Sequence, residues 1–197
     1  SDVNTPTRTS LRKNDGTLIR VVEEGKIEAL NEYQISPKTF FTFNTSDGLL
    51  LNGWMIKPMN FDPGKKYPVL MTVYGGPGSQ TVRNLWGGAD FLWNQLLAQK
   101  GYIIVSIDNR GTGARGRDFK TVTYKNLGKW EANDQIEGAK YLASLPYVDG
   151  SRIGIWGWSY GGYMTLMSML LGADVFKTGV SVAPVTHWKF YDTLYTE

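Results

Sequence analysis

The chain has 197 residues, of which 42% are hydrophobic and 13% aromatic, so it can bury a large core in one main domain. The absence of cysteine excludes disulfides, a thiol nucleophile and a cysteine-ligated metal, and the single histidine excludes a histidine-cluster metal site, so we expect no metal or other cofactor. The net charge of +3 comes from scattered lysines and arginines, which argues against a nucleic-acid partner, and no apolar run approaches the roughly 20 residues that span a membrane.

The N-terminal part predicts a hairpin set apart from the rest. Residues 10 to 22 predict two short strands around Asn14-Asp15-Gly16, a sequence typical of a tight turn. A charged connector, residues 23 to 32, follows it, and the chain becomes much more apolar after Ser36-Pro37. We therefore place a domain boundary near residue 38, between residues 1–38 and a main domain of residues 39–197.

The main domain opens with another predicted hairpin, residues 38–44 and 49–57, and then alternates between strand and helix patterns. Strands are predicted at residues 67–74, 101–108, 152–158 and 177–185, and helices at 90–100, 130–145 and 160–171. Such alternation predicts an α/β fold with a mainly parallel sheet. In the second helix Ala132, Ile136, Ala139 and Ala143 form the apolar face, while Glu131, Asp134 and Lys140 are assigned to its polar side.

The most informative motif is Gly157-Trp158-Ser159-Tyr160-Gly161, a G-x-S-x-G between a predicted strand and a predicted helix. A chain that turns sharply from strand to helix crowds its own backbone, and glycines beside the serine relieve that crowding. The context favours a nucleophile over a chance match in a glycine-rich turn. We therefore predict that Ser159 is the nucleophile of a hydrolase.

A hairpin, strand-helix units and a serine on an elbow follow the order of the α/β-hydrolase fold. In that order the acid and the histidine of the triad follow later strands, so we expect both to lie outside this chain, which would contain only the N-terminal part of the fold. His187 and Asp192 are the candidates within it. Both come too soon after Ser159, and a structural or pocket-rim histidine is the preferred interpretation of His187.

A second motif, Gly111-Thr112-Gly113-Ala114-Arg115-Gly116, matches the G-x-G-x-x-G of dinucleotide-binding turns. Its context is poor, because the acids that follow, Glu131 and Asp134, sit in a helical pattern rather than after a second strand. Dinucleotide binding is therefore a disfavoured alternative.

Four segments of the chain together resemble the dipeptidyl-peptidase IV branch of the prolyl oligopeptidase family of serine peptidases. They are Tyr74-Gly-Gly-Pro-Gly-Ser-Gln80, Asp134-Gln-Ile-Glu137, Gly157-Trp-Ser-Tyr-Gly-Gly162 and Trp188-Lys-Phe-Tyr-Asp-Thr-Leu-Tyr-Thr-Glu197. The resemblance runs from about residue 10 to the end. It implies an N-terminal β-propeller, of which residues 10–22 would be the last hairpin, and a C-terminal hydrolase domain.

The resemblance also implies a function and a site. The activity would be release of N-terminal dipeptides with proline or alanine second, from peptides with a free N-terminus, by a homodimer outside the cytoplasm. Tyr74 would donate its hydroxyl to the oxyanion and Tyr160 its backbone N–H. The proline-accepting pocket would be formed by aromatic and apolar side chains, namely Tyr160, Val185, Trp188, Tyr191 and Tyr195.

Three alternatives stay open. The chain could belong to another prolyl oligopeptidase-type peptidase, such as an acylaminoacyl peptidase or an oligopeptidase, and taken alone each pocket residue could be ordinary packing. It could also be a binding scaffold without turnover. For the isolated 197 residues we expect no peptidase activity, because the activating base is missing, and we expect association through the sheet edge at residues 177–185.

Overall fold

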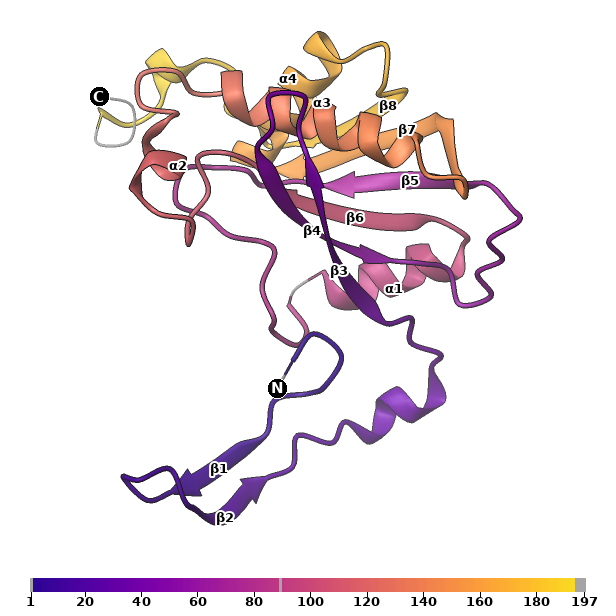
Figure 1. Ribbon diagram of the computed structural model, residues 1–197, viewed down its shortest axis with the longest axis vertical. Coiled ribbons are helices and arrows are strands. Elements are labelled where there is room, and N and C mark those ends of the chain that lie inside the picture. Colours follow the sequence, from indigo (N-terminus) through magenta and orange to yellow (C-terminus); the bar gives the residue numbers. More distant parts are fainter. Residues whose placement is uncertain (1, 89, 194–197) are drawn as a thin grey trace.

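The computed structural model describes residues 2–88 and 90–193, which form a small two-stranded sheet and a six-stranded sheet with helices on both faces (Figure 1). The order of the large sheet is β3-β4-β6-β5-β7-β8. The first two neighbour pairs are antiparallel and the last three are parallel. This is the mixed sheet of an α/β fold, as the alternating pattern predicts.

The predicted N-terminal hairpin is present as β1 (Thr9–Arg12) and β2 (Leu18–Glu23). Gly16 adopts a φ of 85° in its turn, a conformation that favours glycine. A short 3-10 helix, η1 (Glu28–Glu32), occupies the charged connector. In Figure 1 the hairpin extends away from the large sheet.

The large sheet uses the predicted strands with slightly different ends. They are β3 (Lys38–Asn44), β4 (Leu50–Ile56), β5 (Tyr67–Thr72), β6 (Ile103–Asp108), β7 (Val148–Trp158) and β8 (Thr178–Val182). β5 and β7 are parallel neighbours, with Thr72 opposite Trp156. Because parallel strands end at the same edge, the segments after β5 and β7 emerge side by side.

The sheet divides the core into two layers. Along β6, Ile103, Val105 and Ile107 belong to the larger cluster, whereas Ile104 belongs to a smaller one. This alternation is expected, because successive strand residues point to opposite faces. The larger layer packs under α3 (Lys129–Ala143) and α4 (Tyr160–Leu171), and the smaller one under α1 (Phe91–Gln99).

Three details differ from the sequence prediction. A five-residue helix, α2 (Arg117–Thr121), was not predicted. Glu131 and Asp134, assigned to the polar side of α3, are both completely buried. The nearly all-apolar sequence of α4 predicts a buried helix, but part of its surface is open to solvent, and Leu170 is 78% exposed. The amphipathic pattern misplaces the two acids because it scores polarity, whereas their burial depends on partners from distant segments.

Candidate active site

Ser159 stands at the sharp turn between β7 and α4, the predicted position. Its backbone has φ 59° and ψ −117°, outside the regions that residues with a β-carbon normally occupy. The strained residue is fixed from both sides. Its N–H donates to the Val182 carbonyl at 2.9 Å, and its carbonyl accepts from the Tyr163 N–H at 3.0 Å. The turn therefore holds a half-exposed serine rigidly at the edge where β5 and β7 end.

The glycines around Ser159 are required by close backbone contacts. A β-carbon at Gly157 would lie 2.4 Å from the Val73 carbonyl oxygen, and one at Gly161 would lie 2.1 Å from the same atom. A β-carbon at Gly162 would lie 2.7 Å from the Val182 carbonyl oxygen. The elbow thus packs its backbone directly against the ends of β5 and β8, so glycine is the residue that fits at these three positions.

Tyr74 follows the end of β5 and begins the Tyr-Gly-Gly-Pro turn. The Val73 N–H donates to the Trp156 carbonyl at 3.0 Å, which extends the pairing of β5 with β7 to the residue before Tyr74. Tyr74 is 41% exposed, and its hydroxyl makes no hydrogen bond to any residue within 2–88 or 90–193. A hydroxyl so placed can donate to a ligand at this edge.

Aromatic rings connect Tyr74 to the predicted pocket. The Tyr74 and Tyr160 ring centroids are 6.1 Å apart, those of Tyr160 and Trp188 5.6 Å, and those of Trp188 and Tyr191 5.7 Å. Trp188 lies in η2 (Trp188–Phe190). Tyr163, which sequence reasoning missed, packs edge-on against both Tyr160 and Trp188. Its place one turn after Ser159 was the available signal.

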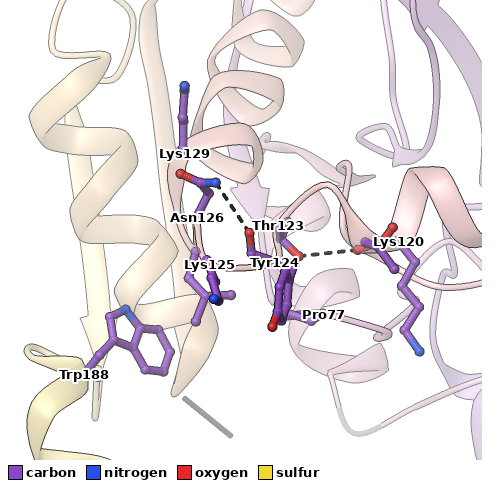
Figure 2. Close-up of a pocket in the computed structure, with 10 residues that line it drawn as sticks. Pro77, Lys120, Thr123, Tyr124, Lys125, Asn126, Lys129 and Trp188 are labelled. Carbon is purple, nitrogen blue, oxygen red and sulfur yellow. Dashed lines mark hydrogen bonds between the residues drawn. The ribbon is translucent and has the colours of Figure 1, made fainter. Parts of the chain in front are cut away.

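A cavity of about 640 Å³ opens beside this aromatic row. Figure 2 shows Trp188 on one side and Pro77 with Tyr124 on the other, while Lys120, Lys125 and Lys129 contribute cations to the lining. Pro77 belongs to the same turn as Tyr74. The cavity therefore adjoins two of the predicted site segments.

The remaining predicted site residues are placed as follows. Val185 is half-buried in the segment between β8 and η2, whereas Tyr195 lies outside the described residues. The His187 ring contacts Phe190, with centroids 5.3 Å apart, and its Nδ1 accepts from the Lys189 N–H at 3.1 Å. Within the described part of the chain, no side chain forms a hydrogen bond with the Ser159 hydroxyl.

Helix α3 presents a buried polar face to the site. Glu131 accepts from the Tyr160 hydroxyl at 2.6 Å with Oε1 and from the Gly128 N–H at 3.0 Å with Oε2. Burial raises the pKa of the Glu131 carboxyl above its ordinary value, against the opposing effect of the Tyr160 hydrogen bond. The capping-box spacing from Gly128 to Glu131 was the sequence signal for the backbone bond.

The same helix supports the loops that flank the elbow. Asp134 accepts the Arg110 backbone N–H at 2.7 Å and pairs with its guanidinium, with Nη2 to Oδ1 at 2.6 Å. Gln135 donates to Asn109 Oδ1 at 2.9 Å, and Asn109 donates to the Gly75 carbonyl at 3.0 Å. A buried chain of hydrogen bonds thus runs from α3 to the turn that carries Tyr74.

The G-x-G-x-x-G segment contacts that turn rather than a free anion site. The Gly113 N–H donates to the Ser79 carbonyl at 2.7 Å, and the Gly78 N–H donates to the Gly111 carbonyl at 2.8 Å. A β-carbon at Gly113 would lie 2.9 Å from the Gly78 carbonyl oxygen. Gly113 is therefore explained by the close packing of these two loops. The N–H of Gly111 also donates to the Phe119 carbonyl at 2.9 Å, so neither N–H is left to hold a phosphate.

Residues 2–88 and 90–193 contain no group of three or more histidine, aspartate or glutamate side chains arranged to hold a metal ion. Within the same ranges, no helix combines the length and apolarity needed to cross a membrane.

The sheet order, the strained serine after β7 and the helix that follows it define an α/β-hydrolase fold with a nucleophile elbow. The model of the prolyl oligopeptidase family matches residues 89–197, more than half of the chain. The chain belongs to the prolyl oligopeptidase family.

The similar proteins described next are named as dipeptidyl peptidases or dipeptidyl-aminopeptidases. The chain is 46% identical over 190 residues to a probable dipeptidyl-aminopeptidase B of Trichophyton verrucosum, which covers 93% of this chain and 20% of the relative. It is 45% identical over 174 residues to a probable dipeptidyl peptidase 4 of Emericella nidulans, covering 87% and 22%. The crystal structure of Porphyromonas gingivalis dipeptidyl peptidase 4 superposes with a TM-score of 0.93 at 47% identity, covering all of this chain and 28% of that one. The chain thus spans about a fifth of the length of these curated relatives.

Proposed function

We propose that the whole protein is a serine exopeptidase that releases N-terminal dipeptides, with proline or alanine preferred at the second position. The observation that carries this proposal is the strained backbone of Ser159, with φ 59°, packed against the end of the strand that leads to Tyr74. Relatives named as dipeptidyl peptidases support the reaction class.

In the proposed mechanism the Ser159 hydroxyl attacks the carbonyl carbon of the second substrate residue and passes its proton to the general base. The peptide bond after that residue breaks, its amine leaves with the proton, and water then hydrolyses the acyl-enzyme to release the dipeptide. The Tyr74 hydroxyl and the Tyr160 backbone N–H stabilise the oxyanion. Tyr160 is the first residue of α4, and the first N–H groups of a helix point out of it toward such a charge. The proline ring of the substrate packs among Tyr160, Val185, Trp188 and Tyr191, together with Tyr195.

The base that activates Ser159 is proposed to lie outside residues 1–197. His187 is the single histidine of the chain, and its Nδ1 is already bonded to the Lys189 N–H. We infer that the 197 residues alone hydrolyse no peptide. We also propose residues 39–197 as the N-terminal portion of the hydrolase domain, and residues 1–38 as the end of a propeller with its connector.

The test compares three chromogenic substrates with the whole protein. Glycyl-prolyl-arylamide should be cleaved, glycyl-glycyl-arylamide cleaved far more slowly, and acetyl-glycyl-prolyl-arylamide not cleaved at all, because its amine is blocked. Release of arylamine from the acetylated substrate would instead identify an oligopeptidase, and release of acetyl-glycine from it would identify an acylaminoacyl peptidase. No cleavage of any of the three would favour a binding scaffold.

A further inference from the structure

We propose that Glu131 is a positioning residue for this peptidase, acting through the side chain of Tyr160 to fix the elbow and the turn of Tyr74. The inference rests on the proposed function. Glu131 is completely buried and bonds the Tyr160 side chain rather than Ser159, so its effect is exerted through the single residue that follows Ser159.

The contacts of Glu131 connect two helix starts. Its side chain is completely buried, and its two oxygens have different partners, the Tyr160 hydroxyl at 2.6 Å and the Gly128 N–H at 3.0 Å. Gly128 precedes α3, and Tyr160 begins α4. One carboxyl group therefore ties the beginning of α3 to the beginning of the nucleophile helix.

The ring of Tyr160 transmits this anchoring to the site. It is 2% exposed and contacts the rings of Tyr74 and Trp188. A β-carbon at Gly76 would lie 3.2 Å from Cγ of Tyr160, so the Tyr-Gly-Gly-Pro turn rests directly on the ring. A rotation of this ring would move both the oxyanion donor Tyr74 and one wall of the pocket.

Packing alone does not explain why Tyr160 is paired with a buried Glu131. Phenylalanine would fill the space of Tyr160 without needing a buried acceptor, and a buried carboxyl group is costly to desolvate. The hydrogen bond to Glu131 fixes the orientation of the Tyr160 ring, because aromatic contacts alone would leave the ring freer to rotate and shift. Orientation of this kind affects turnover more than substrate affinity.

The experiment measures kcat and KM of the whole protein with glycyl-prolyl-arylamide, with active sites counted by fluorophosphonate titration. Glu131→Ala and Tyr160→Phe should each lower kcat per active site on the order of tenfold, with KM changed by less than about twofold. Glu131→Gln should recover part of kcat, because its amide oxygen can still accept from Tyr160 whereas its NH2 group cannot accept from the Gly128 N–H. The double variant Glu131→Ala/Tyr160→Phe should be no slower than either single variant.

Glu137→Ala is the matched control. Glu137 lies on the same helix and accepts the Ser46 N–H at 2.8 Å on the side away from Tyr160, so this variant should keep the wild-type kcat. If Glu131→Ala does not fold, the kcat values of Tyr160→Phe and Glu131→Gln test the proposal instead.

An unchanged kcat in Tyr160→Phe, multiplying losses in the double variant, or a Glu131→Gln variant as slow as Glu131→Ala would each overturn the proposal. If the wild-type protein is labelled at Ser159 but releases no dipeptide, the proposed function fails instead. In that case the rate of fluorophosphonate labelling at Ser159 still tests the positioning role of Glu131, and we expect labelling to be about tenfold slower in Glu131→Ala.

Discussion

Gly161 lies against the backbone of Val73 so closely that a β-carbon on Gly161 would sit 2.1 Å from the Val73 carbonyl oxygen. This contact joins the nucleophile elbow to the end of β5, one residue before Tyr74. It therefore sets the distance between the serine and the proposed oxyanion donor through backbone alone.

Gly161→Ala should consequently disturb both stability and activity. Relief of the clash requires movement of backbone in a packed core, and we expect a loss of about 3 kcal/mol in the free energy of unfolding. Urea denaturation checks this value. Gly64→Ala is the control, because a β-carbon at Gly64 would meet only the end of the flexible Asp62 side chain, at 3.3 Å. Equal stability of the two variants would show that the elbow does not depend on this contact.

Tyr74→Phe should reduce turnover without weakening substrate binding. The hydroxyl is expected to bond the oxyanion of the transition state, and the loss of one such donor costs roughly 2.7–4 kcal/mol, or about 10²–10³ in kcat. Steady-state kinetics of the whole protein provide the measurement. Tyr33→Phe, at a residue 60% exposed in the N-terminal connector, should leave kcat unchanged. A rise in KM at constant kcat would instead assign Tyr74 to substrate binding.

Asp134→Ala should be strongly destabilising. Asp134 is completely buried and accepts hydrogen bonds from both the backbone and the guanidinium of Arg110, whose side chain is 11% exposed. The Arg110 guanidinium would keep only its pair with the half-exposed Asp47, at 2.7 Å, so we expect a cost of about 3 kcal/mol, at the lower end for a broken buried pair. Glu24→Ala breaks the solvent-exposed pair with Arg8 and should change the unfolding midpoint little. Similar midpoints for the two variants would contradict a structural role for Asp134.

Glu131 should make stability fall as pH rises. Burial raises the pKa of its carboxyl in the folded protein above 4.5, the ordinary value that the unfolded chain retains. As pH rises from about 4.5 toward the folded pKa, the unfolded state loses its proton first, so this group favours unfolding progressively. Glu131→Gln should remove that contribution. Urea denaturation between pH 4 and 7 should show a smaller decline for the variant, and identical pH dependence in both proteins would refute the assignment.

The sequence predicts the backbone of the elbow better than it predicts the buried side chains that support the elbow. The spacing of glycines around Ser159 and the strand and helix patterns on either side define the elbow, because both depend on local geometry. The family resemblance assigns Tyr74 and Trp188 to the site, and in the structure the ring of Tyr160 contacts both of them.

The buried faces of α3 were not predictable in the same way. Glu131 and Asp134 look like solvent-facing residues, because their partners Tyr160 and Arg110 are distant in sequence and the hydrogen bonds that justify burial form only after folding. The five-residue helix α2 was also missed, since it is too short for a hydrophobic period to appear.

The most direct test of the account is to find which residue of the whole protein reacts with a fluorophosphonate. After labelling, proteolysis and mass spectrometry, we predict a single adduct on Ser159 and no labelling of Ser159→Ala. An adduct on another serine, or undiminished labelling of Ser159→Ala, would contradict the assignment of Ser159 as the nucleophile.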